Sequence, residues 1–468
     1  MLTGNAMTAP LAAVRQTCAI IRFRPFDSST AEGRSKERYR RAFLTTLTSG
    51  FARCIGIATV FISVPLTLKY LGTERYGLWM AISSAIMILG FSDLGINNGL
   101  LNGIAQAHGK GDRELARRYV SSAFFSLTAV AILIGVIFAV VYRWIPWGSV
   151  FRVTSPRAIA EGGPAMAAFT ACFLCTIPAG IATRVQLGYQ EGFTANLWTS
   201  LGSVLSLLSL LIVIRAHGSL LWLVLAMAGA PIVSLIGNGA YVLAQRPWLC
   251  PSWSHVKADV TRSLLRSGLV FLVLQLAIAI GFSSDNLVLV RVLGPDAVTQ
   301  YSVPSRLFSV VAMLCSMLMA PLWPAYGEAL ARKDHAWARR ALIRALVLSA
   351  GVSLVMSSLL VVFGPALIHW WAGPSITPSR PFVLGLGFWG VLAAMSSAPA
   401  AFLNGVGRIS FQAVVASIAT PVNIGLSVFL THRIGVPGVL FGSILSQMLI
   451  VLPPYYVYIR RYLRSSAT

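Results

Sequence analysis

The stretch GKGDRELARR at Gly109–Arg118 returns in altered form as ARKDHAWARR at Ala331–Arg340, an offset of 222 positions. Each copy holds one aspartate at the same place, Asp112 or Asp334, and each ends in Ala-Arg-Arg. A basic, polar segment of this kind stands out because the chain around both copies is strongly apolar.

The repeat is not confined to these basic segments. LKYLG at 68–72 lies opposite LVRVLG at 289–294, and the distance from the Leu-Gly to the Ala-Arg-Arg is the same in both halves. Self-similarity at one fixed offset indicates a duplicated structural unit. We expect the basic segment itself to fix topology and to cap the helix that follows it.

The composition is that of a membrane protein. Hydrophobic residues make up 56% of the 468 positions, charged residues 11%, and the mean hydropathy is +0.74. A soluble domain carries about a quarter charged residues. Apolar runs recur along the chain, each close to the roughly 20 residues that cross a hydrocarbon core as a helix. Because these runs are continuous and do not alternate, they exclude a β-barrel. The sequence predicts an all-α polytopic membrane protein.

The apolar runs predict about twelve transmembrane helices. Several of them are rich in Gly, Ser and Pro, which allow close helix contacts or bend a helix. The predicted spans cover residues 43–69, 76–104, 119–142, 164–187, 193–215, 219–244, 264–290, 297–326, 341–363, 379–403, 410–431 and 436–459.

The repeat divides these helices into two six-helix lobes. Spans 1–3 match spans 7–9, and by continuation spans 4–6 match spans 10–12. Because six spans separate the copies, both lobes have the same orientation, which is a parallel pseudo-two-fold repeat. The predicted parts are a basic, mostly disordered N-terminal extension, an N-lobe, a cytoplasmic linker, a C-lobe and a cytoplasmic tail, at residues 1–42, 43–244, 245–263, 264–460 and 461–468 in that order.

Lysine and arginine are distributed unevenly between the two sides of the membrane. With the N-terminus in the cytoplasm, 26 of the 37 lie on the cytoplasmic side, 9 lie outside and 2 lie within spans. This bias predicts that both termini are cytoplasmic. The net charge of +23 reflects this topology and an attraction to anionic membrane lipids. Nucleic acid is excluded as a partner, because the charge is divided among loops and forms no single face.

The residues that enzymes, metals and cofactors require do not cluster. Cys172 and Cys175 form a C-x-x-C at helical spacing without His or carboxylate neighbours, which favours packing over metal or redox chemistry. The longest predicted outer loop, 143–163, lacks the acidic motif of a membrane glycosyltransferase, polymerase or ligase. We therefore expect neither an enzyme nor a cofactor, and no metal.

One part of the predicted N-lobe carries a specific pattern. Residues 60–125 contain Leu-Gly-x-x-x-Tyr-Gly-Leu-Trp, then Asp-Leu-Gly followed by asparagines, then Gly-Lys-Gly-Asp and Ala-Arg-Arg. This pattern resembles the opening of polysaccharide exporters in the multidrug/oligosaccharidyl-lipid/polysaccharide (MOP) superfamily. Within it, the sequence is most similar to the bacterial O-antigen and exopolysaccharide flippases.

The resemblance implies a fold and an activity. It implies two lobes in a V, as in multidrug and toxin extrusion (MATE) transporters, with helices 1, 2, 7 and 8 lining a central cavity. It also implies that a saccharide linked to undecaprenyl diphosphate is turned from the inner to the outer leaflet of the bacterial inner membrane. Proton or sodium coupling and contacts with other polysaccharide-assembly proteins stay open. The long N-terminal extension departs from the family pattern.

Four charged residues lie well inside predicted spans, away from the span ends, where charge is costly and usually meets a cavity or a partner. Arg53 is in span 1, Asp93 in span 2, Asp285 in span 7 and Arg306 in span 8. Residue counting along antiparallel helices places Arg53 level with Asp93, and Asp285 at a depth similar to Arg306. They either form two structural salt bridges, or the arginines bind diphosphate or acidic sugars while the aspartates hold and release them.

The repeat favours substrate or ion binding over inherited salt bridges. At the offset of 222, Arg53 corresponds to Gln275 and Asp93 to Cys315, so the charges were not duplicated with the scaffold. Uncharged polar residues complete the cavity candidates, with interhelical hydrogen bonding as the alternative for each: Asn97, Asn98, Asn102, Gln275 and Asn286. Arg184, near the cytoplasmic end of span 4, is expected to extend toward the headgroups.

A cation-coupled multidrug antiporter of the same superfamily is the alternative function. Such a transporter needs carboxylates, often in helix 1 or 7. Span 1 carries Arg53 and no acid, and the chain has only 14 acidic residues, which favours an anionic ligand. Asp93 and Asp285 are the carboxylates that such an antiporter could use, so this alternative stays open.

The topology can be tested by thiol labelling. Single cysteines at Gly111 and Lys333 should both be shielded from a membrane-impermeant thiol reagent in intact cells, because both lie in cytoplasmic loops. A cysteine at Ser155 should react. Labelling at Gly111 but not at Lys333 would overturn the parallel repeat.

Overall fold

The chain folds into helices throughout the part that its computed structural model describes, which is residues 25–465 without 28, 152 and 373–377. No strand occurs in these residues, and eleven helices among them are long and apolar enough to cross a membrane. The chain divides into two compact units, Met1–Gly268 and Leu269–Thr468. The prediction of an all-α polytopic membrane protein is confirmed, and the arrangement of the two lobes in a V stays a prediction.

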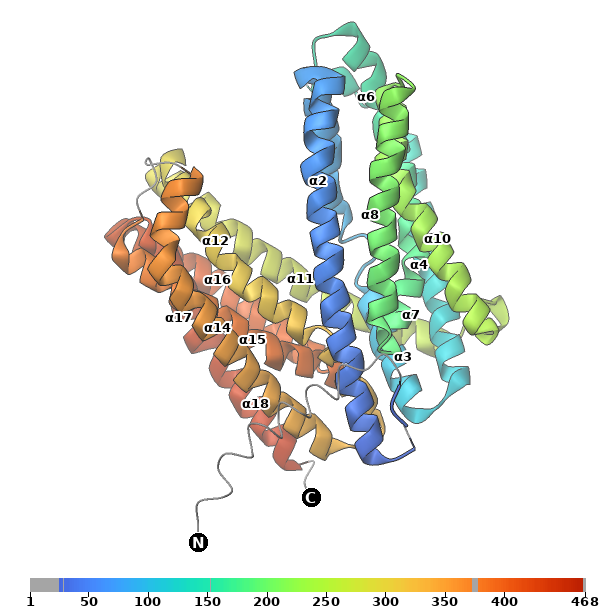
Figure 1. Cartoon of the computed structure of the whole chain (residues 1–468), viewed down its shortest axis with the longest axis vertical. Coiled ribbons are helices and arrows are strands. Elements are labelled where there is room, and N and C mark those ends of the chain that lie inside the picture. Colours follow the sequence, from blue (N-terminus) through green and yellow to red (C-terminus); the bar gives the residue numbers. More distant parts are fainter. Residues whose placement is uncertain (1–24, 28, 152, 373–377, 466–468) are drawn as a thin grey trace. The chain divides into compact units, whose positions relative to one another are not determined.

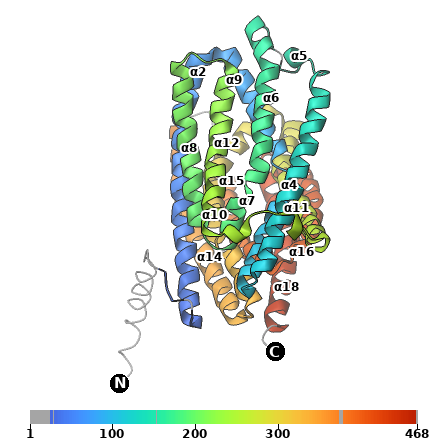
Figure 2. The ribbon, with the colours of Figure 1, turned by 90° about the vertical axis from the view of Figure 1, so that its right-hand side faces the viewer.

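The first unit is built from helices that correspond to the six predicted N-lobe spans, and Figures 1 and 2 both show α2 and α8 side by side. In chain order they are α2 (Ala31–Leu89), α3 (Ile96–Lys110), α4 (Arg113–Tyr142), α5 (Trp147–Phe151), α6 (Pro156–Ala179), α7 (Ile181–Gly188), α8 (Gly192–Arg215), α9 (Leu220–Val224), the π-helical η1 (Leu225–Gly229) and α10 (Ala230–Gln245). Two short 3₁₀ turns, η2 (Pro247–Leu249) and η3 (Trp253–His255), lead into α11 (Ala258–Leu293).

The second unit repeats this order. After α11 come α12 (Pro295–Met319), α13 (Leu322–Ala331), α14 (His335–Ala372), α15 (Arg380–Val406), α16 (Ile409–Ile434), α17 (Pro437–Ser446), the π-helical η4 (Gln447–Val451) and α18 (Leu452–Ser465). Spans 2 and 8 are each split into two helices, α2 with α3 and α12 with α13. The split in span 2 is the longer one, which explains why eleven continuous spans are found where twelve were predicted.

The first helix starts before the membrane. It begins at Ala31, and residues from there to 42 are helical, whereas the sequence predicted that this extension is mostly disordered. The physical reason is that charged side chains in its first turns pair with one another, as in Lys36 with Glu32 (2.7 Å). The prediction for residues 1–24 lies outside the described residues.

The duplication is visible in the backbone conformation. Gly72 adopts φ 76° and ψ 171°, and Gly294 adopts φ 90° and ψ 175°, at the predicted offset of 222. Gly111 and Lys333, also 222 apart, both lie in the left-handed region with φ of 69° and 61°. Conformations this rare recur at one offset only if the two lobes share a backbone plan.

The basic segment caps a helix in both lobes. Asp112 Oδ1 accepts a hydrogen bond from the backbone N–H of Leu115 (2.9 Å), and Asp334 Oδ1 accepts one from Trp337 (3.2 Å). Each carboxylate satisfies a backbone donor that has no partner within its helix and lies at the positive end of the helix dipole. The conserved spacing of the two segments is therefore explained by helix capping, as the sequence predicted.

The repeat extends to the last helix of each lobe. The π-helical segment η1 in span 6 and the segment η4 in span 12 start at Leu225 and Gln447, again 222 positions apart. The loop between spans 4 and 5 matches with a different offset. Gln190 and Gly407, 217 positions apart, both have positive φ and donate to the residue three before them. The offset in this part of the repeat therefore differs by five residues from the 222 found before and after it.

The corner after Gly72 is held by contacts of two acidic side chains, Glu74 and Glu161. Glu74 Oε1 accepts from the backbone N–H of Ser155 (2.9 Å) and of Thr154 (2.6 Å), and these hydrogen bonds lower the pKa of Glu74 to about 2. Arg75 forms a two-pronged ion pair with Glu161 on α6, with distances of 2.7 and 2.8 Å. These contacts join the corner of α2 to the start of α6.

The two positive-φ glycines at the corners should be irreplaceable by alanine. Gly72→Ala and Gly294→Ala should each destabilise the protein by about 1–3 kcal/mol, because a Cβ strains this backbone conformation even where space is open. Gly56→Ala is the matched control. Gly56 also has open space around it but lies in regular helix, so alanine should stabilise by up to about 1 kcal/mol. The melting temperature in detergent measures all three, and equal shifts for Gly56 and Gly72 would contradict the conformational reason.

Candidate functional site

The predicted pair of Arg53 and Asp93 is not formed. Asp93 lies in the turn between α2 and α3, where its Oδ1 accepts from the backbone N–H of Gly95 (2.9 Å) and its Oδ2 from Asn97 Nδ2 (2.9 Å). Arg53 is exposed on α2, and within the described residues its side chain makes no hydrogen bond or ion pair. The salt-bridge alternative is therefore contradicted for this pair, because the residue counting behind it treated span 2 as one continuous helix.

Span 2 is interrupted at the level of this aspartate. The chain leaves the helix after Leu89, and Leu94 and Gly95 are both left-handed, with φ of 50° and 71°, before α3 begins at Ile96. Two consecutive left-handed residues, one of them not glycine, store strain of the kind found at ligand sites. Irregular backbone at membrane depth is tolerated only where protein or a water-filled cavity surrounds it.

The asparagines at the start of α3 differ in burial. Asn97 is 8% exposed and its Oδ1 is buried without a hydrogen-bond partner. Asn98, one position along, is half-buried. An acceptor left unpaired in a buried place costs about 1–3 kcal/mol, so Asn97 is poorly explained by packing alone.

Arg184 lies near Asp93, and the expectation that it extends toward the headgroups stays a prediction. It sits on α7, is half-buried, and feels the negative charge of Asp93. No hydrogen bond or ion pair of its side chain occurs in the part of the chain that the structure describes. One feature of the sequence could have indicated this environment: an arginine in a span with no acid of its own requires a partner from another helix.

In the second lobe the predicted pair of Asp285 and Arg306 is also absent. Asp285, 9% exposed on α11, accepts a hydrogen bond on Oδ2 from the Tyr301 hydroxyl of α12 (2.9 Å), and its Oδ1 is buried without a partner. Arg306 is exposed on α12 and takes no part in this contact. Tyr301, and not Arg306, contacts Asp285 because Tyr301 lies five residues earlier on α12, on the side that faces α11. Sequence reasoning missed it because a tyrosine at a span end reads as an interfacial anchor.

The uncharged candidates of helix 7 lie at two levels of α11. Gln275 is half-buried, and Asn286 is exposed and accepts a hydrogen bond from the Ser302 hydroxyl (3.2 Å). Asn286 is therefore already engaged between α11 and α12. Of the two, Gln275 retains more hydrogen-bonding capacity.

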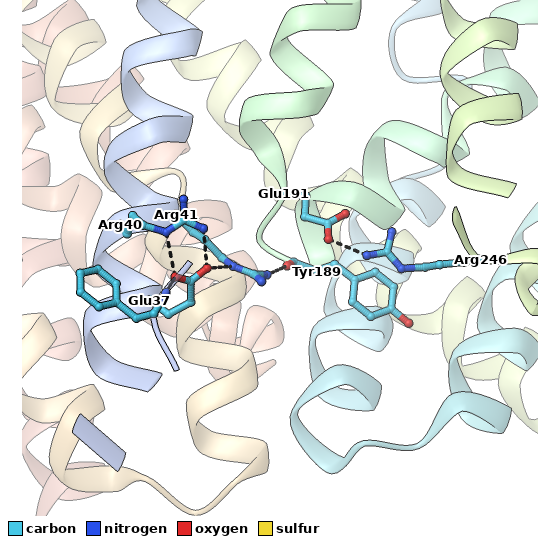
Figure 3. A network of polar contacts seen from close by, with 7 residues as sticks. Glu37, Arg40, Arg41, Tyr189, Glu191 and Arg246 are labelled. Carbon is cyan, nitrogen blue, oxygen red and sulfur yellow. Dashed lines mark hydrogen bonds and ion pairs between the residues drawn. The ribbon is translucent and has the colours of Figure 1, made fainter. Parts of the chain in front are cut away.

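Other arginines of the first unit are neutralised. Figure 3 shows Glu37, 5% exposed, accepting from Arg40 (2.6 and 2.8 Å) and from Arg41 (2.8 Å), while Arg41 also donates to the carbonyl of Tyr189 (2.7 Å). These contacts fasten the start of α2 to the loop before α8. Each of these charges has a close opposite charge or carbonyl, as expected of a structural network.

The same network continues on the far side of Tyr189. Arg246, at the end of α10, pairs with Glu191 (2.5 Å) and lies over the Tyr189 ring, 4.5 Å from its centroid. Burial raises the pKa of the Tyr189 hydroxyl to about 12. This cluster contrasts with Arg53 and Arg184, whose guanidinium groups have no such contacts among the described residues.

A metal site is not formed in the described part of the chain. No group of three or more His, Cys, Asp or Glu side chains there could hold an ion. Of the C-x-x-C pair on α6, Cys172 is buried and Cys175 is exposed, and neither is in a disulfide.

The duplicated helical lobes, with interrupted helices and charges at membrane depth, define a polytopic membrane protein of the transporter type. The family model described as polysaccharide biosynthesis protein matches residues 42–330, and the MatE family model matches residues 272–429. The chain therefore belongs to the polysaccharide biosynthesis protein family, within the MOP superfamily.

Individual relatives agree with this assignment. The chain is 24% identical over 308 residues to a Salmonella typhimurium protein described as an O-antigen transporter, a match that spans 64% of this chain and just under two thirds (66%) of that protein. It is 22% identical over 390 residues to a Yersinia pseudotuberculosis O-antigen export protein, spanning 78% and 85% of the two chains. A MATE crystal structure in the bent conformation shares the fold, with a TM-score of 0.77 at 16% identity over 92% of this chain and 97% of that one.

Breaking the Asp285–Tyr301 hydrogen bond should lower stability, whereas removing the whole polar pair should not. Tyr301→Phe should destabilise by about 1–3 kcal/mol, since it leaves both carboxyl oxygens of Asp285 without a donor. Adding Asp285→Leu should restore or exceed the wild-type stability, because the buried polar pair is then removed as a whole. Melting temperatures in detergent test this, with Tyr456→Phe as the exposed control. A double variant less stable than both single variants would contradict this expectation and show that the polar pair stabilises the fold.

Proposed function

We propose that this protein turns a lipid-linked saccharide from the cytoplasmic to the outer leaflet of the bacterial inner membrane, for polysaccharide biosynthesis. The observation that carries the proposal is the match of residues 42–330 to the polysaccharide biosynthesis family. The relatives described as O-antigen transport and export proteins support the same substrate class. The lipid carrier is undecaprenyl diphosphate in this proposal.

The charges of the first lobe suit an anionic substrate. The membrane part of α2 carries Arg53 and no acidic residue between 43 and 69, and Arg184 adds a second positive charge at membrane depth. A diphosphate needs guanidinium groups whose donors are not already engaged, because two parallel hydrogen bonds to its oxygens require a free planar edge. Both arginines meet this condition among the described contacts.

The repeat supplies a means of movement. Two lobes of the same backbone plan and the same orientation can expose a substrate path alternately to each side of the membrane by rocking as rigid parts. The positive-φ corners at Gly72 and Gly294 join helices within each lobe without regular helix geometry. In this proposal the saccharide passes through a polar path while the prenyl tail stays in lipid.

Asp285 is the residue to which we assign the coupling ion. It is a buried carboxyl with one oxygen on Tyr301 and the other unpaired, and no described cation lies against it. A carboxyl that is poorly compensated when charged gains from binding a proton or a cation. The matching group in the first lobe is Ser63, so only one lobe carries this residue.

A multidrug antiporter remains the second candidate, since the MatE model matches residues 272–429. The two functions differ in a measurable way. Loss of a flippase removes polysaccharide from the cell surface and leaves lipid-linked precursor in the inner leaflet. Loss of an antiporter changes susceptibility to cationic drugs.

Deleting the gene should abolish surface polysaccharide without changing drug susceptibility, and the wild-type gene should restore it. Arg53→Ala should reach normal membrane abundance, because no described contact depends on Arg53, yet it should fail to restore the polymer. Arg53→Lys should restore part of it, since a point charge cannot make two parallel hydrogen bonds to a diphosphate. Asp285→Asn, which keeps the acceptor for Tyr301 but cannot exchange a proton, should also fail.

Arg215→Ala is the matched control, because Arg215 is an exposed arginine in the last turn of α8. It should restore the polymer fully. Full restoration by Arg53→Ala at normal abundance would remove Arg53 from the substrate path. Normal polymer in the deletion strain together with increased drug susceptibility would replace the flippase by the antiporter.

A further inference from the structure

Two transmembrane helices of the first lobe are irregular beside one another. Span 2 breaks between α2 and α3, and span 4 is interrupted at Gly180, where α6 gives way to α7. The halves that follow, α3 and α7, pack so closely that a Cβ on Gly188 would lie 2.6 Å from the side chain of Ile104. The charge of Asp93, in the turn before α3, acts on Arg184 of α7, so these groups belong to one region within a single lobe.

Arg184, the positively charged residue of this region, has hydrogen-bond donors without partners among the described residues. A guanidinium carries five N–H donors, and those of Arg184 meet no acceptor among the described residues. Asp93 attracts it, but both carboxylate oxygens of Asp93 already accept from Gly95 and Asn97. If Arg184 served only to neutralise Asp93, a direct hydrogen-bonded ion pair would be the expected geometry.

The neutral member has an unused acceptor. Asn97 is held by its Nδ2 on Asp93, which fixes the direction of its other atom, and that Oδ1 is buried without a partner. The region thus offers donors from Arg184 and an acceptor from Asn97. A ligand that satisfies both must carry an anionic or other strong acceptor next to a hydroxyl or amide donor.

The second lobe is an internal control for a structural explanation. Its span 8 is interrupted at Ala320–Pro321, which corresponds to positions 98–99 and not to the break at 90–95. The counterparts of Asp93, Asn97 and Arg184 are Cys315, Met319 and Ala401. The counterpart of Arg184 follows from the offset of 217 that relates Gln190 to Gly407. The second lobe therefore folds with apolar side chains at the positions of the three polar groups, so the shared scaffold does not require those groups.

We propose that Arg184 and Asn97 form the subsite for the phosphate-linked end of the saccharide, Arg184 binding phosphate oxygens and Asn97 Oδ1 a hydroxyl of the first sugar. Asp93 is the positioning residue that holds Asn97 and keeps Arg184 in place before the ligand arrives. The inference rests on the function proposed above and names the part of the substrate that the first lobe recognises.

The test is equilibrium binding to the purified full-length protein in detergent, read by native mass spectrometry. The probes are undecaprenyl diphosphate, the same carrier with one N-acetylhexosamine, undecaprenol and phosphatidylglycerol. Arg184→Met should weaken both diphosphates roughly 10- to 100-fold, as expected for lost hydrogen bonds between charged groups, and leave undecaprenol unchanged. Arg184→Lys should be intermediate. Asn97→Ala should weaken only the glycosylated carrier.

Arg215→Met is the matched control and should bind every probe as the wild type does. Melting temperatures show whether each variant is folded. If Arg184→Met is not folded, the binding of Arg184→Lys and of Asn97→Ala tests the subsite. Wild-type binding of both diphosphates by Arg184→Met would overturn the subsite and leave the proposed function standing. An equal loss of phosphatidylglycerol would assign Arg184 to bulk lipid headgroups and also overturn it. A wild-type protein that binds no carrier would overturn the proposed function itself.

Discussion

A charge in the hydrocarbon layer costs several kcal/mol unless a partner or water compensates it, and this constraint decides what the polar residues of this chain can be. At the start of α2, before the membrane, the charges neutralise one another, since Glu37 accepts from Arg40 and Arg41. Arg184 and Asp285 are different, because each retains capacity that the described residues do not use. The distinction between satisfied and unsatisfied charge separates the structural network from the candidate sites.

The fold could be predicted from the sequence because its signals are long and redundant. Twelve apolar runs, a basic bias on one side and a repeat at one offset all require the same architecture, and errors of a few residues at a span end do not change it. The offset of 222 positions found in the sequence recurs in the backbone angles of Gly72 and Gly294 and in the helix caps formed by Asp112 and Asp334. Helix capping explains why the basic segment is written twice.

The site could be predicted only in part. Asp93, Asn97 and Asp285 could be selected from the sequence as candidates, but their hydrogen-bond partners could not, because residue counting assumes straight, unbroken helices. The left-handed pair Leu94–Gly95 turns Asp93 toward its own backbone, and a tyrosine donates to Asp285 in place of Arg306. Partner choice depends on side-chain direction over distances of a few ångströms, and no pattern along one chain specifies it.

The duplication makes the differences between the lobes informative. Where both lobes need a residue for folding, it recurs: glycine at the corner, aspartate at the cap, a π-helical turn in the last span. The polar groups at membrane depth do not recur, since Asp93 corresponds to Cys315 and Asp285 to Ser63. A scaffold tolerates the loss of such groups in one copy, and their cost in the other copy must be offset by something outside the scaffold. In the function proposed above, an anionic ligand offers that compensation in the first lobe and a proton or cation offers it in the second, so that substrate binding and ion binding are assigned to different halves of one repeated frame.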